Sequence, residues 1–363
     1  MRFWTDKEMY RKQQKSSTQL RTLTKFAVLL LTFSYWWLIF AGTGGFRFSS
    51  AAAESRVPEQ GGAFFQSENV AVYVAKKGDT FSDLARRFYN DAEKAWIIKE
   101  TNELVALKPG HVLVIPLQPV NPGGLSPDGY QVVSILTYHH FSERCTNTLC
   151  MPVKEFFRQM GYLKREGYRT VTMKEVLRFM NYQEPLPRKA IAITIDDGYR
   201  SAYDLAYPIL KRYNFTATLF IYTDFINKSP NALTWEQLKE LTQAGFEVET
   251  HTMSHADLTL KCAGESESEY LQRIRHELQI PRTLIREHLG KEAVWLAYPY
   301  GRMNNLVISL AIEAGYRGGV TVTRGSTPFF ANPFKVGRNQ VMNPVKKHSF
   351  EQLVKFFHRE AIR

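Results

Sequence analysis

Two pairs of residues in this 363-residue chain have the types and spacing for chemistry. Asp196 and Asp197 are adjacent and directly follow the apolar run at 190–195. Two like charges this close resist joint ionisation unless a proton or a cation intervenes. His251 and His255 are four residues apart, and on a helix both rings could reach one ion. One Asp and two His with an open coordination position suit a catalytic metal.

Each pair also has a simpler explanation. Asp-Gly is a common turn, so Asp197-Gly198 could merely end a strand and cap a helix. Two histidines at this spacing could be surface or capping residues. Position favours chemistry, because His251 and the Asp pair both directly follow predicted strands, at 246–250 and 190–195.

The elements that would carry these residues alternate between strand and helix over residues 130–363. The patterns predict strands at 132–137, 190–195, 217–222, 246–250 and 294–297, and helices at 156–165, 202–213, 235–244 and 265–288. This alternation predicts an α/β fold with a parallel sheet or barrel. The polar clusters fall at the ends of the strands, where barrels of this kind gather their active site.

Three segments in this region resemble motifs of one enzyme family. They are Thr194-Ile-Asp-Asp-Gly198, His251-Thr-Met-Ser-His255 and Tyr298-Pro-Tyr-Gly301. In motif order and spacing, residues of about 132–340 resemble the NodB-type polysaccharide deacetylases, carbohydrate esterase family 4. The resemblance implies a distorted (β/α) barrel of NodB type. It also implies hydrolysis of N-acetyl groups on polysaccharide that contains N-acetylglucosamine.

The resemblance assigns roles to individual residues. Asp197, His251 and His255 would hold a divalent metal, most often zinc. Asp196 would be the general base that activates the attacking water, and the backbone N–H of Tyr300 would stabilise the oxyanion. An acid would then protonate the departing amine. The identity of the metal stays open, because one carboxylate and two imidazoles accept several ions.

The chain departs from the family pattern at this acid. Many members carry a His in a carboxy-terminal Leu-x-His segment, and here only Phe356-Phe-His358 comes near it. Tyr138-His139-His140 precedes the Asp pair instead. That placement resembles the permuted branch of the family, which includes deacetylases of poly-N-acetylglucosamine, and it implies His139 as the acid. The alternative is that His139 only packs or caps.

A second departure concerns the support of the general base. The third motif usually carries an Arg that orients the base carboxylate, but no Arg directly precedes Pro299. Arg338, in Phe334-Lys-Val-Gly-Arg338, could replace it from another strand. The alternative is an exposed Arg338 with no role in the site.

A smaller unit at 70–118 precedes this region, and its pattern predicts a strand, two helices and a closing strand. It resembles a LysM domain in Tyr73-Val-Ala-Lys-Lys-Gly-Asp-Thr-Phe81 and Leu107-Lys-Pro-Gly-His-Val-Leu-Val-Ile-Pro116. The resemblance implies binding of glycans that contain N-acetylglucosamine, through Gly78, Asp79, Thr80, Phe81, Asn102, Leu107 and Pro109. For Gly78, Pro109 and Gly110 plain turn chemistry is the favoured explanation, with binding through backbone groups.

The first 46 residues predict a membrane anchor. Residues 1–25 hold seven basic and two acidic side chains, a surplus of +5 within the net charge of +12. Because much of the positive charge belongs to this tail, nucleic-acid binding is not expected. Residues 26–41 carry no charge, and 42–46 extend the run toward the ~20 residues that span a bilayer. The basic flank predicts a cytoplasmic amino terminus, with the rest of the chain on the periplasmic or cell-wall side.

Cleavage, linkers and cysteines complete these expectations. A cleaved signal is the alternative to an anchor, with Ala51-Ala52-Ala53 as the cleavage site and secretion as the result. Linkers are predicted at 47–69 and 119–129 from their content of small and turn-forming residues. Export would permit a disulfide between Cys145 and Cys150, but the spacing is also compatible with free thiols.

Three functions compete on this sequence. The leading hypothesis is a membrane-anchored, metal-dependent polysaccharide deacetylase whose LysM-like unit holds it on its polymer. The second is a non-catalytic wall-binding protein that retains an enzyme fold, and the third is a metal hydrolase of another amide or ester. The LysM-like unit favours peptidoglycan as the polymer, whereas Tyr138-His139 favours poly-N-acetylglucosamine. The oligomeric state stays open.

Overall fold

The computed structural model of the chain describes residues 62–344 and 347–360. The predicted cytoplasmic tail (1–25), the predicted membrane segment (26–46) and most of the first predicted linker (47–69) lie outside these residues. Within the described ranges, no helix has the length and hydropathy that crossing a bilayer requires.

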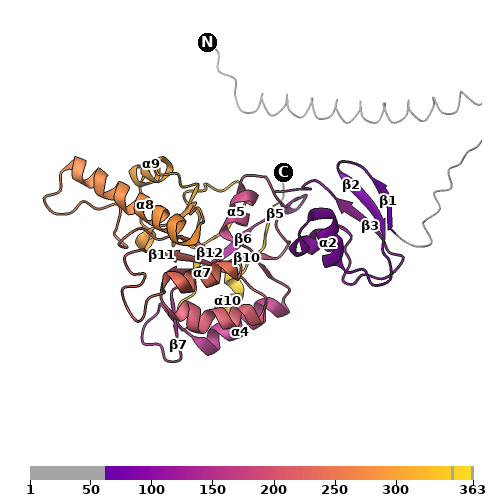
Figure 1. Ribbon diagram of the computed structural model, residues 1–363, viewed down its shortest axis with the longest axis horizontal. Helices are drawn as coiled ribbons and strands as arrows, with labels where there is room; N and C mark the ends of the chain where they lie inside the picture. Colours follow the sequence, from indigo (N-terminus) through magenta and orange to yellow (C-terminus); the bar gives the residue numbers. More distant parts are fainter. Residues whose placement is uncertain (1–61, 345–346, 361–363) are drawn as a thin grey trace, which may run out of the picture. The chain divides into compact units, whose positions relative to one another are not determined.

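The small unit consists of a sheet and helices around one apolar core. Its elements are β1 (Gly62–Gln66), β2 (Val70–Val74), α2 (Phe81–Tyr89), η2 (Ala92–Lys94), α3 (Ala95–Thr101) and β3 (Val112–Pro116). The three strands are antiparallel in the order β1-β2-β3 (Figure 1). Alternate residues of β2 and β3 meet both helices in a core of Ala71, Tyr73, Leu84, Ala85, Ile98, Leu113 and Ile115. The predicted strand-helix-helix-strand order is confirmed.

The prediction of a linker at 47–69 is wrong in part, because β1 belongs to this sheet. Gly62–Gln66 pairs with β2, with one irregularity of register between Ala63 and Phe65. An edge strand needs only one partner for its backbone. The five residues of β1 include Gly and Gln and lack the alternation of apolar and polar residues by which strands are predicted.

The larger unit is built around a curled sheet. Among the described residues, nine strands join it in the order β14-β13-β12-β11-β10-β6-β15, with β16 also paired to β6 and β9 to β10. The pairs are parallel except that of β15 with β6. The strands are β6 (Val133–Tyr138), β9 (Arg169–Thr170), β10 (Ala190–Asp197), β11 (Thr218–Ile221), β12 (Glu247–Thr250), β13 (Trp295–Ala297), β14 (Gly318–Val320), β15 (Ser326–Thr327) and β16 (Asn339–Gln340).

The carboxy-terminal part of the chain joins the two ends of this sheet. Val336 pairs with Val320 of β14 at one end, and Asn339 pairs with Leu136 of β6 near the other. The sheet therefore curls into an incomplete barrel. The predicted α/β class with a distorted barrel is confirmed to this extent.

Strand β10 shows how the curvature places polar side chains. Successive side chains alternate between the faces of a strand. One face packs outward against helices through Ile191, Ile193 and Ile195. The other faces the interior, where Ala192 packs with Phe220 and Trp295. Asp196 falls on this interior face, four positions after Ala192.

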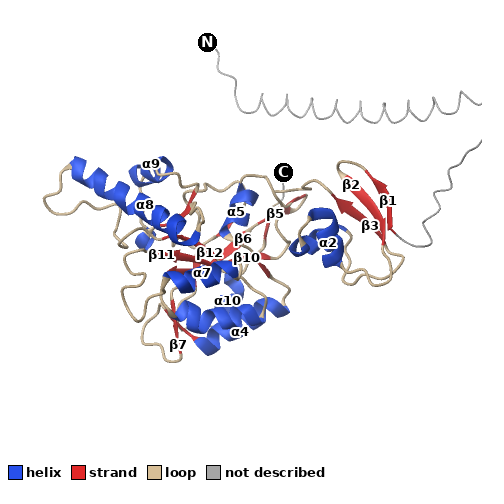
Figure 2. Cartoon of the chain, in the orientation of Figure 1, coloured by secondary structure: helices blue, strands red, loops and turns tan. Residues whose placement is uncertain are grey.

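Helices surround the strands (Figure 2). They are α4 (Val153–Arg165), α5 (Met173–Met180), η3 (Ala202–Ala206), α6 (Tyr207–Arg212), α7 (Trp235–Gln243), α8 (Glu267–Leu289), η4 (Pro299–Gly301), α9 (Asn305–Glu313) and α10 (Lys347–Leu353). The four predicted helices correspond to α4, to η3 with α6, to α7 and to α8. The helices α5, α9 and α10 were not predicted, because they have nine residues or fewer and show too few turns for a clear period.

The second linker prediction, at 119–129, is also wrong in part. Its last residues enter a small antiparallel sheet of order β17-β5-β4, formed by β4 (Leu125–Ser126), β5 (Gly129–Gln131) and β17 (Phe357–Arg359). Two-residue strands are defined by their partners rather than by their own sequence.

The disulfide that the sequence left open is present. Cys145 and Cys150 are bonded, with their Cα atoms 5.4 Å apart, and Cys262 is exposed and free. The bridged loop leads from β7 (His140–Ser142) to β8 (Cys150–Pro152), which pair in parallel.

Packing between β13 and β14 allows a direct test of the fold. A Cβ on Gly318 would collide with the indole ring of Trp295. That ring is fully buried, and its Nε1–H donates to the carbonyl of Met173 at 2.9 Å, so it has little room to move. We expect Gly318→Ala to lower the free energy of unfolding by about 1–3 kcal/mol, measured by urea denaturation.

Gly325→Ala is the matched control for this substitution. A Cβ at Gly325 has nothing within 4 Å. The control should change stability by less than about 0.5 kcal/mol. Equal effects of the two variants would contradict the packing described here.

Candidate active site and metal centre

Strand register brings the predicted base and acid to the same level. Ile195 of β10 pairs with Tyr138 of β6 in a parallel ladder. The next residues, Asp196 and His139, therefore lie side by side at the carboxyl ends of neighbouring strands. Residues 57 positions apart in sequence (196 − 139) reach one edge only because the ladder has this register.

Two predicted metal ligands, Asp197 and His251, lie at the same edge of the sheet. Ile221 of β11 pairs with Asp197 on one side and with Thr250 of β12 on the other. His251 follows Thr250 directly, so it leaves the sheet level with Asp197. The prediction that these strand ends meet is therefore confirmed by the ladders.

Asp196 is held by a buried Arg338. The Nη1–H and Nη2–H of its guanidinium group donate to Asp196 Oδ1 and Oδ2 at 2.8 and 2.7 Å. Arg338 also donates to Thr194 Oγ1 and to the carbonyl of Thr321, each at 3.1 Å. Only 1% of Arg338 and 2% of Asp196 is exposed, so the alternative of an exposed Arg338 is excluded.

This contact determines the charge of Asp196. Burial alone would raise the pKa of Asp196, but the charge and hydrogen bonds of Arg338 outweigh it and hold the pKa below its ordinary value. Both carboxylate oxygens already accept hydrogen bonds in a bidentate geometry. Asp196 is therefore a carboxylate at neutral pH.

Asp197 ends β10 in a turn that ordinary residues avoid. Its φ is 76°, and that of Gly198 is 90°. A Cβ on Gly198 would also press against the side chain of Ile226, so this position favours glycine on two grounds. The turn aims the carboxylate of Asp197 at the two histidines.

The three predicted ligand atoms have the spacing of a metal site. His251 Nε2 and His255 Nε2 lie 3.6 and 3.5 Å from Asp197 Oδ1. These separations are long for hydrogen bonds but close to the ~3.3 Å between ligands that lie ~2.0–2.1 Å from a tetrahedral zinc ion. The buried Oδ1 of Asp197 has no hydrogen-bond partner among the described residues. The donor set therefore fits a divalent cation.

Local contacts prepare His251 for this task. Its Nδ1 lies 2.7 Å from the carbonyl oxygen of Ala297, which fixes Nδ1 as the protonated nitrogen and leaves the Nε2 lone pair toward Asp197. Burial lowers the pKa of His251 to about 4, and burial also lowers the pKa of His255. Both rings are therefore neutral at pH 7, as metal ligation requires.

The segment that carries both histidines is a loop, so the helix considered for this spacing is wrong. Thr252 and His255 have φ of 70° and 63°, in the left-handed region. The His255 N–H donates to Thr252 Oγ1 at 3.1 Å. The two rings meet edge to face with centroids 4.6 Å apart, which a tight loop achieves as well as a helix.

Tyr300 lies at the rim of the site. It belongs to η4, has a φ of 60° and is 59% exposed. Its ring contacts that of His255 edge to face, with centroids 4.9 Å apart. The neighbouring N–H groups of Gly301 and Arg302 bond back to the carbonyls of Tyr298 and Pro299, whereas no bond from the Tyr300 N–H is found among the described residues.

Of the two candidate acids, only His139 is at the site. Burial lowers the pKa of His139, and the negative charge of Asp196 opposes that effect. His358 instead lies on β17, where it stacks on Tyr130 with centroids 5.0 Å apart. Strand β17 pairs with β5, which leads into the amino-terminal end of β6. His358 therefore lies away from the carboxyl ends of the strands, where Asp196 is found. The Phe356-Phe-His358 candidate is therefore wrong.

The predicted glycan contacts of the small unit have structural bonds of their own. Asp79 Oδ2 accepts from the Tyr73 hydroxyl and the Lys76 N–H, and Thr80 caps α2. The Asn102 amide bonds both backbone groups of Val114 at 2.8 Å and so joins α3 to β3. The remaining predicted contacts, Gly78, Phe81, Leu107 and Pro109, lie in the same two loops or beside them. A glycan contact at any of them stays a prediction.

An arc of aromatic rings lies beside the predicted metal ligands and was not predicted from the sequence. Tyr199 lies between His140 and Phe225, with centroid distances of 5.2 and 5.4 Å. Tyr222 continues the arc from Phe225 at 5.2 Å to His255 at 5.3 Å. Tyr199 and Tyr222 each follow a strand by one or two residues, which was the only available signal.

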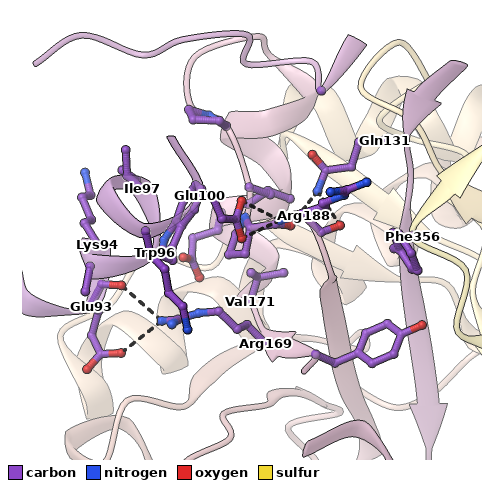
Figure 3. A pocket seen from close by; sticks show the side chains of 18 of the residues that line it. Glu93, Lys94, Trp96, Ile97, Glu100, Gln131, Arg169, Val171, Arg188 and Phe356 are labelled. Carbon is purple, nitrogen blue, oxygen red and sulfur yellow. Dashed lines mark hydrogen bonds and ion pairs between the residues drawn. The ribbon is translucent and has the colours of Figure 1, made fainter. Parts of the chain in front are cut away.

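Figure 3 shows a pocket in a different part of the molecule. Its labelled residues include Glu93, Trp96 and Glu100 as well as Arg169 and Arg188. Arg169 Nη2 donates to the carbonyl of Glu93, and the Arg188 N–H lies 3.2 Å from each carboxylate oxygen of Glu100. None of the predicted catalytic or metal-ligating residues lines this pocket, so the candidate site lies elsewhere.

Comparison with known proteins finds similarity to one family within the larger unit. Residues 183–319 match the family model described as polysaccharide deacetylase. The match contains Asp196, Asp197, His251, His255 and Tyr300, whereas His139 and Arg338 lie outside it, so their placement rests on the geometry above.

Individual relatives agree with this assignment. The chain is 34% identical over 192 residues to Bacillus subtilis (strain 168) YxkH, whose name assigns it provisionally to the polysaccharide deacetylases; the match spans 53% of this chain and 65% of YxkH. It is 26% identical over 206 residues to poly-beta-1,6-N-acetyl-D-glucosamine N-deacetylase of Staphylococcus aureus (strain MRSA252), spanning 55% of this chain and 69% of that protein. The solved structure of Streptococcus pyogenes deacetylase PplD with acetate superposes at a TM-score of 0.56 and 25% identity, over 62% of this chain and 98% of that chain.

The candidate site should bind metal in a pH-dependent way. Burial, and then the negative charge of Asp196, raises the pKa of Asp197 to about 7. Below that pH the carboxyl must lose its proton before it can bind a metal ion. We therefore expect the apparent Zn²⁺ affinity to fall about tenfold per pH unit from pH 7 to 5.5 and to be constant above about pH 7. Isothermal titration calorimetry in buffers of different ionisation enthalpy should show proton release near pH 6 that disappears by about pH 8.5.

Asp197→Asn is the control for this measurement. It keeps the shape of the ligand but has no proton to release, so binding should be weaker and the part of the pH dependence due to residue 197 should vanish. A Zn²⁺ affinity of the parent chain that stays constant from pH 5.5 to 7 would show that metal binding displaces no proton from Asp197 in this range and would contradict the raised pKa.

Proposed function

We propose that this chain is a metal-dependent hydrolase that removes N-acetyl groups from polysaccharide containing N-acetylglucosamine. The observation that carries the proposal is the division of labour between adjacent carboxylates. Asp196 is bound by Arg338 and faces the interior, whereas Asp197 faces two neutral histidines. The named activity of the Staphylococcus aureus relative supports the acetamide as the bond that is cleaved.

Asp196 is suited to be the general base. Its carboxylate is ionised at neutral pH and oriented by Arg338, and it lies next to the metal ligand Asp197. A water positioned between these side chains and an acetamide gives its proton to Asp196 as its oxygen attacks the carbonyl carbon. A divalent cation held by Asp197, His251 and His255, proposed to be Zn²⁺, would polarise the carbonyl and acidify the attacking water.

Tyr300 and His139 would complete the reaction. The Tyr300 N–H donates to the oxygen that becomes negative as the tetrahedral carbon forms. The C–N bond then breaks, and His139 protonates the departing nitrogen. Because burial lowers the pKa of His139, its protonated form is a stronger acid than an exposed imidazolium. One water is consumed, and acetate and a glucosamine unit are released.

The aromatic arc supports a carbohydrate as the substrate. Sugar rings present C–H faces that pack on aromatic rings, and Tyr300 offers an exposed ring next to His255. Peptidoglycan and poly-N-acetylglucosamine both carry the required acetamide. The Staphylococcus aureus relative supports poly-N-acetylglucosamine, whereas the small unit supports peptidoglycan.

We also propose that residues 70–118 bind the same polymer as a LysM domain. Their strand-helix-helix-strand order and the two loops around Thr80 and Leu107 support this assignment. The second binding unit would raise the local concentration of substrate at the deacetylase domain.

The cellular location is a further proposal, because the residues that would decide it lie outside those described. We propose a single-pass anchor at 26–46, with the amino terminus in the cytoplasm and both domains on the periplasmic or cell-wall side. Secretion would follow if the segment were cleaved near Ala53. Protease protection of the tail in intact cells distinguishes the two outcomes.

Acetate release tests the proposed function directly. The full-length chain, with Zn²⁺ and after chelation, is incubated with peptidoglycan, poly-N-acetylglucosamine and chitooligosaccharides. We expect Asp196→Asn to lower kcat by at least about 100-fold, because the base is lost, and chelation to abolish release. Asp204→Asn, an exposed carboxylate paired with Arg200, is the control and should retain activity.

Two other outcomes would favour the competing functions. Glycan binding without acetate release from any polymer favours a non-catalytic wall-binding protein. Release of acid from small esters alone favours a hydrolase of another substrate class.

Arg338→Lys tests the support of the base. An ammonium group cannot make the bidentate contact, so the Asp196 carboxylate should be misplaced and its pKa should rise. We expect kcat to fall by about 100-fold. Because activity requires the ionised carboxylate and is lost as pH falls through its pKa, the acid limb of the pH–rate profile should move to higher pH.

Arg273→Lys is the matched control, since Arg273 contacts both carboxylate oxygens of Glu265 outside the site. It should leave the rate and the pH profile unchanged. Unaltered turnover in Arg338→Lys would show that Arg338 does not orient the base.

A further inference from the structure

The loop that carries His255 needs support from its surroundings. Thr252 and His255 both have φ in the left-handed region, at 70° and 63°. Non-glycine residues enter this region at a cost, and a loop holds it only when neighbouring contacts over-determine it. Met253 and Ser254 lie between these two residues, so their backbone groups are where such contacts must act.

Glu277 on helix α8 supplies the contacts on one side of the loop. Its Oε2 accepts hydrogen bonds from the N–H groups of Met253 at 3.0 Å and Ser254 at 2.9 Å. Its Oε1 accepts from the Ser254 hydroxyl at 2.6 Å. Glu277 is only 3% exposed although it lies on a largely polar helix. A buried carboxylate with three donors around it is a strong anchor, because its hydrogen bonds are charge-assisted.

The segment after β11 supplies the contacts on the other side. The Thr223 N–H donates to the carbonyl of Thr252 at 3.3 Å, and the Asp224 N–H donates to that of Met253 at 2.9 Å. Glu277 therefore accepts from the N–H groups of Met253 and Ser254, and the backbone of the segment after β11 donates to the carbonyls of Thr252 and Met253. Four backbone groups of residues 252–254 are thus bonded from outside the loop.

We propose that Glu277 is the positioning residue of the metal centre, setting His255 against Asp197 and His251. His255 directly follows the clamped Ser254, and its Nε2 must stay at the 3.5 Å from Asp197 Oδ1 that a shared ion requires. The inference rests on the proposed function only through the metal centre. Glu277 touches neither substrate nor metal and acts through the loop.

Metal affinity separates positioning from a general effect on folding. Zn²⁺ binding to the full-length chain is measured by competition with a chromogenic chelator, at a temperature where circular dichroism shows each variant folded. Glu277→Leu removes all three acceptor contacts, and we expect its Zn²⁺ affinity to fall by about 10–100-fold. Ile274→Ala is the control, because Ile274 lies on the same helix and is fully buried in an apolar cluster, and its side chain has no group that could accept the hydrogen bonds of the loop. Its affinity should stay within about threefold of the parent chain.

Two further measurements keep the test decisive. Glu277→Asp retains the charge but withdraws the carboxylate by one methylene, so it should lose about tenfold in Zn²⁺ affinity and serves if Glu277→Leu does not fold. In metal-free protein, amide hydrogen exchange at Met253 and Ser254 should accelerate at least about tenfold in either Glu277 variant and not in Ile274→Ala.

The outcomes are distinct for the two proposals. Glu277 variants that bind Zn²⁺ as tightly as Ile274→Ala, or that retain exchange protection at Met253 and Ser254, overturn the role of Glu277. A parent chain that binds no Zn²⁺ overturns it as well. A chain that binds Zn²⁺ in a Glu277-dependent way but releases no acetate supports the positioning role while the proposed function fails.

Discussion

Two buried carboxylates on neighbouring residues are the constraint around which the site is built. Folding shields both Asp196 and Asp197 from most of the solvent, and two negative charges at this spacing cannot both persist without positive charge nearby. Arg338 supplies it for Asp196 through two short hydrogen bonds. Asp197 faces neutral His251 and His255, and its pKa rises to about 7. Asp196 is thus ionised at neutral pH, whereas a cation beside Asp197 would favour the ionised form of that carboxyl.

The curled sheet is what allows Arg338 to meet this demand. Residue 338 lies between Val336, which pairs with β14, and Asn339, which pairs with β6. The segment that joins the two ends of the sheet is therefore the one that delivers a guanidinium to its interior. Closure of the sheet and ionisation of Asp196 are therefore linked. Removing Arg338 from this buried pair would leave Asp196 as an uncompensated charge, which costs about 3–5 kcal/mol. A chain with an open sheet would have no route for this side chain to Asp196.

The sequence predicted those parts of the site that follow apolar strands. Asp196, Asp197 and His251 each come directly after a buried run, and parallel strand ends meet whatever the details of the loops. It could suggest Arg338 only as a replacement for a missing residue, since no local pattern reports a contact across 142 positions. Glu277 escaped entirely, because one Glu on a polar helix looks like any other until its burial is known. Strands such as β1 and β4 were missed because their partners, rather than their composition, define them.

Backbone conformation explains why the loops were harder to predict than the strands. Asp197, Thr252, His255 and Tyr300 all have φ between 60° and 76°, a region where glycine would cost less. Glycine cannot serve at three of these positions, because the carboxylate, the imidazole and the Thr252 hydroxyl that holds the His255 N–H are needed. The site therefore keeps side chains where the backbone disfavours them, and the strain must be balanced by contacts from elsewhere. The bonds from Glu277 and from the segment after β11 are contacts of this kind, so the supporting residues of such a site should be sought beside its left-handed residues rather than beside its ligands in sequence.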